Sequence, residues 1–264
     1  VHQPEKIRAP EVQQLLENVA PDVIVIIAYG QIVPARLLAI PKHGWINLHA
    51  SLLPKYRGAA PVHWVIANGE THSGLTTMRI DAGMDTGDIL LQREMEIDPA
   101  ETTPELARRM SEAGAPLMEE TLRGLATGTI VPRAQNPADA TVAPLLKKED
   151  GRIDWNRPAQ DIYNRMRGFA PWPGAYTAFR GQTCHLWGEP APESSLPAGN
   201  HPSLAATQSA PGTLFGFKND WFASCGNATL LRLQSVKLEG RKQVRLSEFV
   251  SGARLKPGER FGDP

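Results

Sequence analysis

The sequence predicts an α/β protein of two domains, in which a parallel sheet with helices is followed by a small β-barrel or sandwich. Residues 23–29 form an apolar, mostly β-branched run without alternation, which is typical of a strand buried on both faces of a parallel sheet. After residue 175, short strand-like segments are separated by Gly, Pro and Asn, which favours a barrel or sandwich. Because the 264 residues exceed the ~250 at which single cores stop growing, we expect two domains.

Helices and strands alternate in the first domain. Apolar residues recur with helical spacing in 11–19, and Pro21 ends that helix. A helix capped by Thr102 or Thr103 is expected to run to Ala126, with a break near 114–116 where Gly and Pro occur. The other expected elements are strands at 23–30, 44–49, 74–80 and 89–97 and helices at 34–38 and 61–68.

A polar, proline-containing connector at 131–144 separates the domains, which we place at residues 1–140 and 141–264. The second domain is expected to begin with a helix around 159–168. A segment rich in Gly, Pro and Ser, 189–211, is expected to form a long surface loop within it. The expected strands of this domain are 175–179, 183–187, 212–217, 221–225 and 229–236.

The charge balance conceals a difference between the two halves. The 28 Lys and Arg residues equal the 28 Asp and Glu residues, which ordinarily argues against a nucleic-acid partner. Residues 1–140, however, hold 12 basic and 17 acidic residues, whereas residues 141–264 hold 16 and 11. The stretch 237–256 carries a net charge of +4 and suits contact with a phosphate backbone, with an ordinary basic face as the alternative. Its candidate contacts are Lys237, Arg241, Lys242 and Arg245.

Composition also excludes several classes of protein. Cys184 and Cys225 are too few for a disulfide framework, and no paired Cys or His spacing indicates a zinc site. The longest apolar run is far shorter than the ~20 residues of a membrane span, and no basic-then-apolar leader precedes it. We therefore expect a cytoplasmic monomer with no metal and no membrane partner.

Two polar residues of the 44–49 segment indicate a site. Asn47 and His49 are two residues apart on a predicted strand, so their side chains leave the same face. The carboxyl end of such a strand is where open parallel sheets bind ligands. An amide that can hold an oxyanion beside an imidazole that can move a proton suits acyl transfer, although a strand histidine is more often structural.

Two longer motifs favour the functional reading. Asn-x-His is followed by Ser-Leu-Leu-Pro at 51–54, and Gly-Met-Asp-Thr-Gly-Asp occurs at 83–88. These segments resemble the formyltransferase superfamily that uses 10-formyltetrahydrofolate. Arg-Gly-Ala-Ala-Pro at 57–61, the 83–88 loop and Pro-Trp-Pro-Gly at 171–174 are similar to the branch of that family that acts on tRNA. The resemblance covers nearly the whole chain and implies a Rossmann-like catalytic domain followed by an OB-like barrel.

The resemblance implies transfer of a formyl group from N10 of the folate co-substrate to the α-amino group of methionine esterified to initiator tRNA. It identifies Asn47, His49 and Asp85 as the catalytic residues. Asn47 would donate a hydrogen bond to the oxyanion, and His49 would stabilise that charge and shuttle protons. Asp85 would orient His49 and help to move the proton from the amine towards N10. The alternative for Asp85 is a turn residue without chemistry.

Binding residues are implied in the same way. The folate pterin is expected against Tyr29, Gly30 and the loop with Asp81 and Gly83, although Tyr29 can equally be read as a strand-end aromatic. The residues expected to line the same cleft are Ser51, Leu52, Leu53 and Pro54. Arg57, in the loop after the catalytic strand, is expected to contact tRNA together with Lys237, Arg241, Lys242 and Arg245 of the second domain. Met84 and Trp172 are expected to be packing residues.

Two departures and two alternatives accompany the resemblance. Ala50 follows the catalytic His where the family commonly has Gly. Family members also open with further α/β units, so about two βα units of ~30 residues each are expected to precede Val1, and we expect weak or no activity without them. The alternatives are a sugar-nucleotide N-formyltransferase, which shares Ser-Leu-Leu-Pro and the Arg-Gly core, and a non-catalytic RNA-binding protein.

Overall fold

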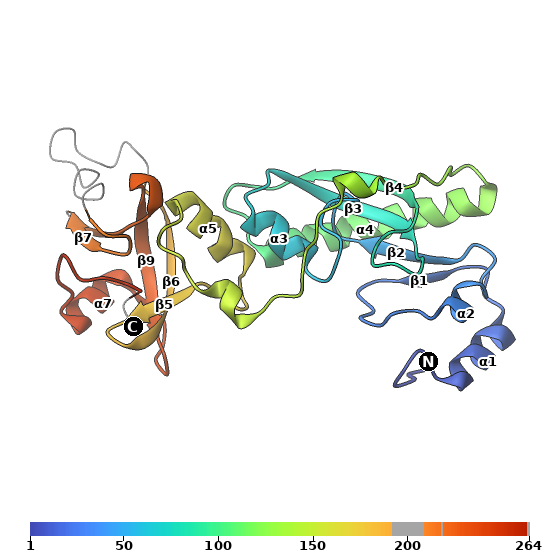
Figure 1. The fold of residues 1–264 in the computed structure, drawn as a ribbon, viewed down its shortest axis with the longest axis horizontal. Helices are drawn as coiled ribbons and strands as arrows, with labels where there is room; N and C mark the ends of the chain where they lie inside the picture. The colour runs from blue at the N-terminus through green and yellow to red at the C-terminus, as the bar shows by residue number, and fades with distance from the viewer. Residues whose placement is uncertain (192–208, 218, 263–264) are drawn as a thin grey trace. The chain divides into compact units, whose positions relative to one another are not determined.

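The computed structural model describes residues 1–191, 209–217 and 219–262, and these divide into two compact units (Figure 1). The first unit comprises Val1–Val65, Glu70–Glu101 and Glu105–Leu145, and the second comprises the other described residues. Residues 141–145, expected in the second domain, thus belong to the first unit. The reason is local, because the backbone at Thr141 and Ala143 is hydrogen-bonded to that of Arg57.

A four-stranded sheet of order β1-β2-β3-β4 forms the centre of the first unit. β1 (Ile24–Ile26) pairs in parallel with β2 (Trp45–His49), as expected for an α/β fold. β3 (His72–Arg79) and β4 (Ile89–Glu96) then extend the sheet in antiparallel pairing. In the described chain β1 is the end strand, and Val25 is 37% exposed.

The first unit has four described helices, all at predicted positions. The predicted break near 114–116 is wrong, because one helix continues through Pro116. Its apolar face packs on the sheet, and this tertiary packing outweighs the weak helix propensity of Gly and Pro. The helices are α1 (Pro10–Val19), α2 (Ala35–Leu38), α3 (Pro61–Ala67) and α4 (Thr103–Thr127), and a 3-10 turn, η1 (Pro137–Asp139), follows.

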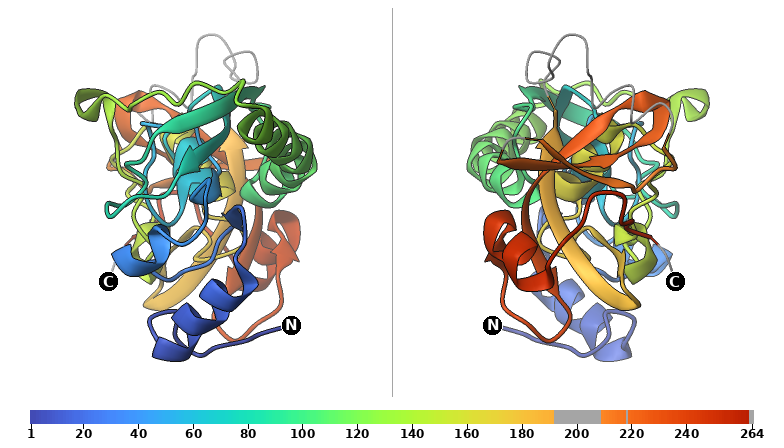
Figure 2. Two further views of the ribbon diagram at one scale, coloured as in Figure 1. Left: turned by 90° about the vertical axis from the view of Figure 1, so that its right-hand side faces the viewer. Right: turned by 90° about the vertical axis from the view of Figure 1, so that its left-hand side faces the viewer.

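The two faces of β2 meet different helices, as Figure 2 helps to follow. Ile46 packs with Met118 of α4, whereas Trp45 packs in a cluster with Leu37 of α2 and residues of α1. Side chains alternate along a strand. Asn47 and His49 therefore lie on the face of β2 turned away from α4, which is the side on which a site can open.

An antiparallel sheet of six strands forms the second unit, with the order β5-β6-β9-β8-β7 and β10 paired to β9. The predicted strands and the helix α5 are confirmed, whereas β10 and α7 were not predicted. The part of the expected 189–211 loop at 192–208 lies outside the described residues. The elements are η2 (Lys148–Gly151), α5 (Ala159–Gly168), β5 (Tyr176–Phe179), β6 (Gln182–Pro190), β7 (Leu214–Phe217), β8 (Asp220–Ser224), η4 (Gly226–Ala228), β9 (Leu230–Leu238), β10 (Val244–Arg245) and α7 (Leu246–Ala253).

The inner face of this sheet and its two helices enclose an apolar core. Phe249 of α7 lies in this core with Ile162 of α5. Cys184 and Cys225 are buried there as thiols, and burial raises the pKa of each to about 12. They act as small apolar side chains and not as nucleophiles. No helix in the described ranges is both long enough and apolar enough to cross a bilayer.

Candidate active site

A cavity of about 680 Å³ opens in the first unit beside the carboxyl ends of β1 and β2. This volume lies within the ~300–1,000 Å³ of sites that bind small molecules. Its walls come from four parts of the chain that are far apart in sequence. The lining residues fall in the ranges 26–33, 47–50, 58–63 and 80–85, together with Met78.

His49 has a defined proton arrangement on the wall of this cavity. Its side chain is 5% exposed, and Nε2 lies 2.8 Å from the backbone oxygen of Tyr56. A carbonyl oxygen can only accept a hydrogen bond, so Nε2 carries a proton. The other ring nitrogen, Nδ1, lies 3.6 Å from Asp85 Oδ2. That distance suits an ion pair with the charged imidazolium but is too long for a strong hydrogen bond.

Asp85 reaches His49 from the loop that joins β3 to β4. Its Oδ2 accepts a hydrogen bond of 2.8 Å from the backbone N–H of Gly58. Its backbone is in the left-handed region, with φ of 54°, a conformation that Asp adopts more readily than most residues. Asn47 lines the same cavity, and within the described residues its side-chain amide has no protein hydrogen-bond partner. The structure thus brings the three residues expected to be catalytic to one cavity.

The β3–β4 loop is closed by its own side chains. Asp81 accepts hydrogen bonds from Thr86 Oγ1, at 2.7 and 2.8 Å, and from the Gly83 N–H, at 3.0 Å. A Cβ on Gly87 would lie 2.0 Å from the Arg79 backbone oxygen, so only glycine permits this closure. Asp81 and Gly83 line the cavity, as do Tyr29 and Gly30. Gly87 thus allows the close approach of the Arg79 backbone.

Met84 and Trp172 are not packing residues as expected. Met84 is 66% exposed and lines the cavity, and Trp172 is 55% exposed. Met84 follows Gly83, and Trp172 lies between Pro171 and Pro173, so both side chains belong to turns in which they are exposed.

The four residues at 51–54 do not line the cavity. Ser51 and Leu53 are buried: Ser51 Oγ donates to the Lys55 backbone oxygen at 2.6 Å, and the Leu53 N–H donates to Thr76 Oγ1 at 3.1 Å. Their contact with folate stays a prediction, and the hydrogen bonds of Ser51 and Leu53 show a supporting role. Ser51, Leu52, Leu53 and Pro54 shape the loop that presents the Tyr56 carbonyl to His49.

The connector at 131–144, expected to be a linker, is hydrogen-bonded to the loop that follows β2, and we call this segment the strap. Thr141 Oγ1 accepts a hydrogen bond of 2.8 Å from the Tyr56 N–H. The Arg57 N–H donates to the Thr141 oxygen at 2.9 Å, and the Ala143 N–H donates to the Arg57 oxygen at 2.7 Å. Its polar composition gave no signal for this, because strand-like pairing of a single short segment leaves no periodicity in the sequence.

Gln135, within this strap, was not recognised from the sequence. Its Nε2 donates to the backbone oxygens of Asp85, at 2.9 Å, and Gly87, at 2.7 Å. Its Oε1 accepts hydrogen bonds from Arg57 Nε, at 3.1 Å, and Nη2, at 2.7 Å. The guanidinium of Arg57, expected to contact tRNA, is thus engaged inside the catalytic unit. A lone Gln in a polar connector carries no motif by which it could have been found.

His63 of α3 is a further titratable residue on the cavity wall. Burial lowers the pKa of His63 below its ordinary value, so its imidazole is neutral near pH 7. Its sequence context carries no sign of this role, although His63 lies two residues after the Arg-Gly-Ala-Ala-Pro motif. It supplies a neutral hydrogen-bonding group to the cavity.

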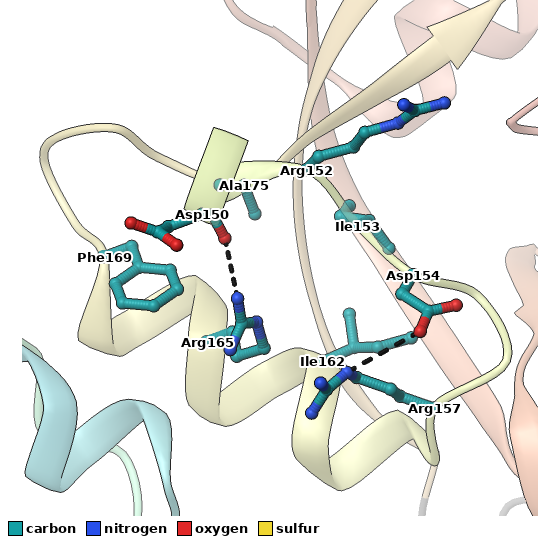
Figure 3. A pocket seen from close by; sticks show the side chains of 10 residues that line it. Asp150, Arg152, Ile153, Asp154, Arg157, Ile162, Arg165, Phe169 and Ala175 are labelled. Carbon is teal, nitrogen blue, oxygen red and sulfur yellow. Dashed lines mark hydrogen bonds and ion pairs between the residues drawn. The ribbon is translucent and has the colours of Figure 1, made fainter. Parts of the chain in front are cut away.

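A much smaller hollow in the second unit, shown in Figure 3, is not a ligand site. Its volume of about 10 Å³ admits no more than about one water molecule. Arg165 fills one side, donating to the Asp150 backbone oxygen at 2.9 Å and lying 4.8 Å above the Phe169 ring. Burial lowers the pKa of Arg165, with Arg157 as the second cause. These residues support the fold.

Aromatic and basic side chains share the outer face of the second unit's sheet. Tyr176, His185 and Trp187 lie in a row, with ring centroids 5.8 and 6.5 Å apart. Lys237 of β9 lies opposite His185 of β6. Ser235 of β9 pairs with Trp187 of β6 on one side and with Arg245 of β10 on the other. We call the surface formed by five residues the outer aromatic face: Tyr176, His185, Trp187, Lys237 and Arg245. Arg241 and Lys242 are exposed in the turn between β9 and β10.

Comparison with family models identifies the class of protein. Residues 2–122 match the model described as formyl transferase, and residues 145–254 match formyl transferase, C-terminal domain. Together the two matches cover most of the chain, which therefore belongs to the formyl transferase family. The family expected from the sequence motifs is confirmed.

Curated relatives specify the branch of that family. A methionyl-tRNA formyltransferase of Solibacter usitatus is 49% identical over 263 residues, covering 100% of this chain and 80% of the relative. Those of Acidobacterium capsulatum and Geobacter metallireducens are 48% and 46% identical, each over 99% of this chain and 81% and 80% of the relative. The chain is a member of the methionyl-tRNA formyltransferases and spans about four fifths of their length.

Solved structures with low sequence identity share the fold. WlaRD, a sugar 3N-formyl transferase solved with dTDP and 5-N-formyl-THF, matches with a TM-score of 0.60 and 19% identity over 86% of this chain and 77% of its own. HypX from Aquifex aeolicus, in complex with tetrahydrofolic acid, matches with a TM-score of 0.61 and 17% identity over 96% of this chain and 45% of its own. The predicted formyltransferase fold is thereby confirmed.

Proposed function

We propose that this protein transfers the formyl group of 10-formyltetrahydrofolate to the α-amino group of methionyl-initiator-tRNA, giving N-formylmethionyl-tRNA for translation initiation in the cytoplasm. The observation that carries the proposal is the convergence of an amide, an imidazole and a carboxylate on one cavity. Asn47, His49 and Asp85 supply these groups, in a chain 49% identical to a named methionyl-tRNA formyltransferase.

The cavity has the features that a folate requires. Its volume of about 680 Å³ accommodates a molecule of this size. Tyr29 offers an aromatic ring, and the backbone at Gly30 is open to the hydrogen-bonding edge of a pterin because nothing lies within 4 Å of the position of a Cβ there. Asp81 accepts the Gly83 N–H and so holds the neighbouring loop in place.

The side chains support a formyl transfer with balanced protons. The amine nitrogen forms a bond to the formyl carbon, the bond from that carbon to N10 breaks, and one proton moves from the amine to N10. The amide of Asn47, without a protein partner in the described chain, would donate to the developing oxyanion. The carboxylate of Asp85 would accept the amine proton and pass it towards N10. His49, fixed by the Tyr56 carbonyl, would stabilise the negative charge beside it.

We propose that the outer aromatic face and the β9–β10 turn contact the tRNA. Nucleic-acid surfaces combine cations for phosphates with flat rings on which unpaired bases stack. Lys237 and Arg245 are exposed beside the ring row. Burial and the nearby Lys237 lower the pKa of His185, so this ring is uncharged near pH 7 and can stack. Arg241 and Lys242 would extend the basic surface.

Exchanging two of these cations should weaken tRNA binding and its dependence on salt. We expect Lys237→Glu/Arg245→Glu to reduce affinity for methionyl-tRNA and to lower the slope of log K against log salt by about one unit per lost phosphate contact. Filter binding at several salt concentrations measures both. Lys6→Glu, at an exposed lysine of the first unit, is the matched control. An unchanged slope in the double variant would contradict tRNA contact at this face.

The function itself is tested by offering competing acceptors. The full-length protein, supplied with radiolabelled 10-formyltetrahydrofolate, should label methionyl-initiator-tRNA and should not label a dTDP- or UDP-linked amino sugar. Labelling of the sugar alone would make the protein a sugar N-formyltransferase. Calorimetry with a stable formyl-folate analogue tests the third reading, because an RNA-binding protein without catalysis should bind none.

A further inference from the structure

We infer that Gln135 is a positioning residue for catalysis, which fixes the carboxylate of Asp85 against His49 through two backbone carbonyls. This inference rests on the proposed function of the cavity. Its basis is that the side-chain amide of Gln135 is hydrogen-bonded both to the β3–β4 loop, which carries Asp85, and to Arg57. The four hydrogen bonds involved span 2.7–3.1 Å.

The orientation of the Gln135 amide is determined by chemistry. The guanidinium of Arg57 has only donors, so the group that faces it must be the amide oxygen. The backbone oxygens of Asp85 and Gly87 are only acceptors, so the group that faces them must be the NH₂. Reversing the amide would oppose donor to donor and acceptor to acceptor. Arg57 therefore sets the orientation in which Gln135 can hold the loop.

The carbonyls that Gln135 holds determine where the Asp85 carboxylate lies. Asp85 has a φ of 54°, a left-handed conformation that is uncommon outside glycine. A hydrogen bond to the Asp85 carbonyl and another to the Gly87 carbonyl fix the peptide plane that directly follows this strained residue and the plane two residues further along the loop. The side chain then projects so that Oδ2 meets the Gly58 N–H at 2.8 Å and His49 Nδ1 at 3.6 Å.

The Gly58 amide offers a readout that does not depend on activity. Its N–H is protected from exchange by Asp85 Oδ2, so it reports whether the carboxylate is in place. In Gln135→Leu, which keeps the volume and loses the hydrogen bonds, we expect hydrogen exchange at Gly58 to rise at least about tenfold, to the level of Asp85→Ala. Gln135→Glu should do the same, because a carboxylate still accepts from Arg57 but cannot donate to the two carbonyls.

The kinetic consequence separates positioning from binding. We expect Gln135→Leu to lower kcat by about 10- to 100-fold with little change in KM for either substrate, because misplacement of a reacting group by ~1 Å costs up to ~10²-fold. The double variant Arg57→Leu/Gln135→Leu should be no slower than Gln135→Leu, since Arg57 acts through Gln135. Additive losses would instead assign Arg57 a contact of its own.

The control is the next residue along the strap. Asn136→Ala removes a side chain that caps the turn at 137–139 and whose hydrogen bonds, among the described residues, stay within that turn. It should leave kcat and Gly58 exchange unchanged. Normal Gly58 protection in a folded Gln135→Leu protein would overturn the inference. If wild type transfers no formyl group to tRNA, the proposed function fails, while the exchange measurement still decides the role of Gln135.

Discussion

Replacing His49 with alanine is expected to lower kcat/KM for formyl transfer by about 10²- to 10⁴-fold, the usual contribution of a positioned proton-transfer group. The imidazole is held at Nε2 by the Tyr56 carbonyl and faces Asp85 with Nδ1. Its removal takes away the group that stabilises charge at the reacting carbon. It also leaves the Asp85 carboxylate without its neighbouring partner in a largely buried position. Steady-state kinetics with methionyl-tRNA as the varied substrate provide the measurement.

A second histidine serves as the control for this variant. His72 lies at the exposed start of β3 and hydrogen-bonds to Thr71, outside the cavity. His72→Ala should retain wild-type kcat/KM. His49→Gln adds a test of chemistry against shape, because an amide can replace the hydrogen bond to Tyr56 but cannot become charged at the position of Nδ1. Activity close to wild type in His49→Gln would exclude a proton or charge role for this residue.

Local patterns predicted most elements of both units because those elements bury one face. The helix at 159–168 shows helical spacing of apolar residues and occurs as α5 with the same bounds. The short strands of the second unit were visible because Gly, Pro and Asn separate them. The run at 23–29 predicted a parallel strand, and β1 pairs in parallel with β2. The strand could be recognised because β-branched residues fit a pleated surface.

The candidate site divides in the same way. Asn47 and His49 were predictable as a pair because a strand period of two places them on one face. Gln135 was not predictable, because it lies 50 residues from Asp85 along the chain and joins it only through the fold. The residues at 51–54 were recognised by their motif, and the structure places them outside the lining of the cavity, in the loop before Tyr56. A motif records that residues are required and not whether they touch a ligand or support the loop that does.

Asn47→Ala is expected to lower kcat by about 10²- to 10³-fold, the typical cost of removing one oxyanion donor. The reason is that the Asn47 amide meets the cavity without a protein partner in the described chain, so its donors are available to the substrate oxygen. The formyl oxygen gains its negative charge only in the transition state. The loss should therefore fall on kcat, with KM for the folate little changed.

Asn47→Asp makes this argument more specific, because it keeps the size of the side chain and replaces the donor with a negative charge. An anion placed where an oxyanion develops should be at least as damaging as alanine. If Asn47 acted only by filling space, Asn47→Asp would be nearly as active as wild type and Asn47→Ala would be the poorer variant. Asn18→Ala, at an exposed position near the end of α1, controls for general effects of removing an amide. The order of activities among the two Asn47 variants thus separates oxyanion stabilisation from packing within one series of assays.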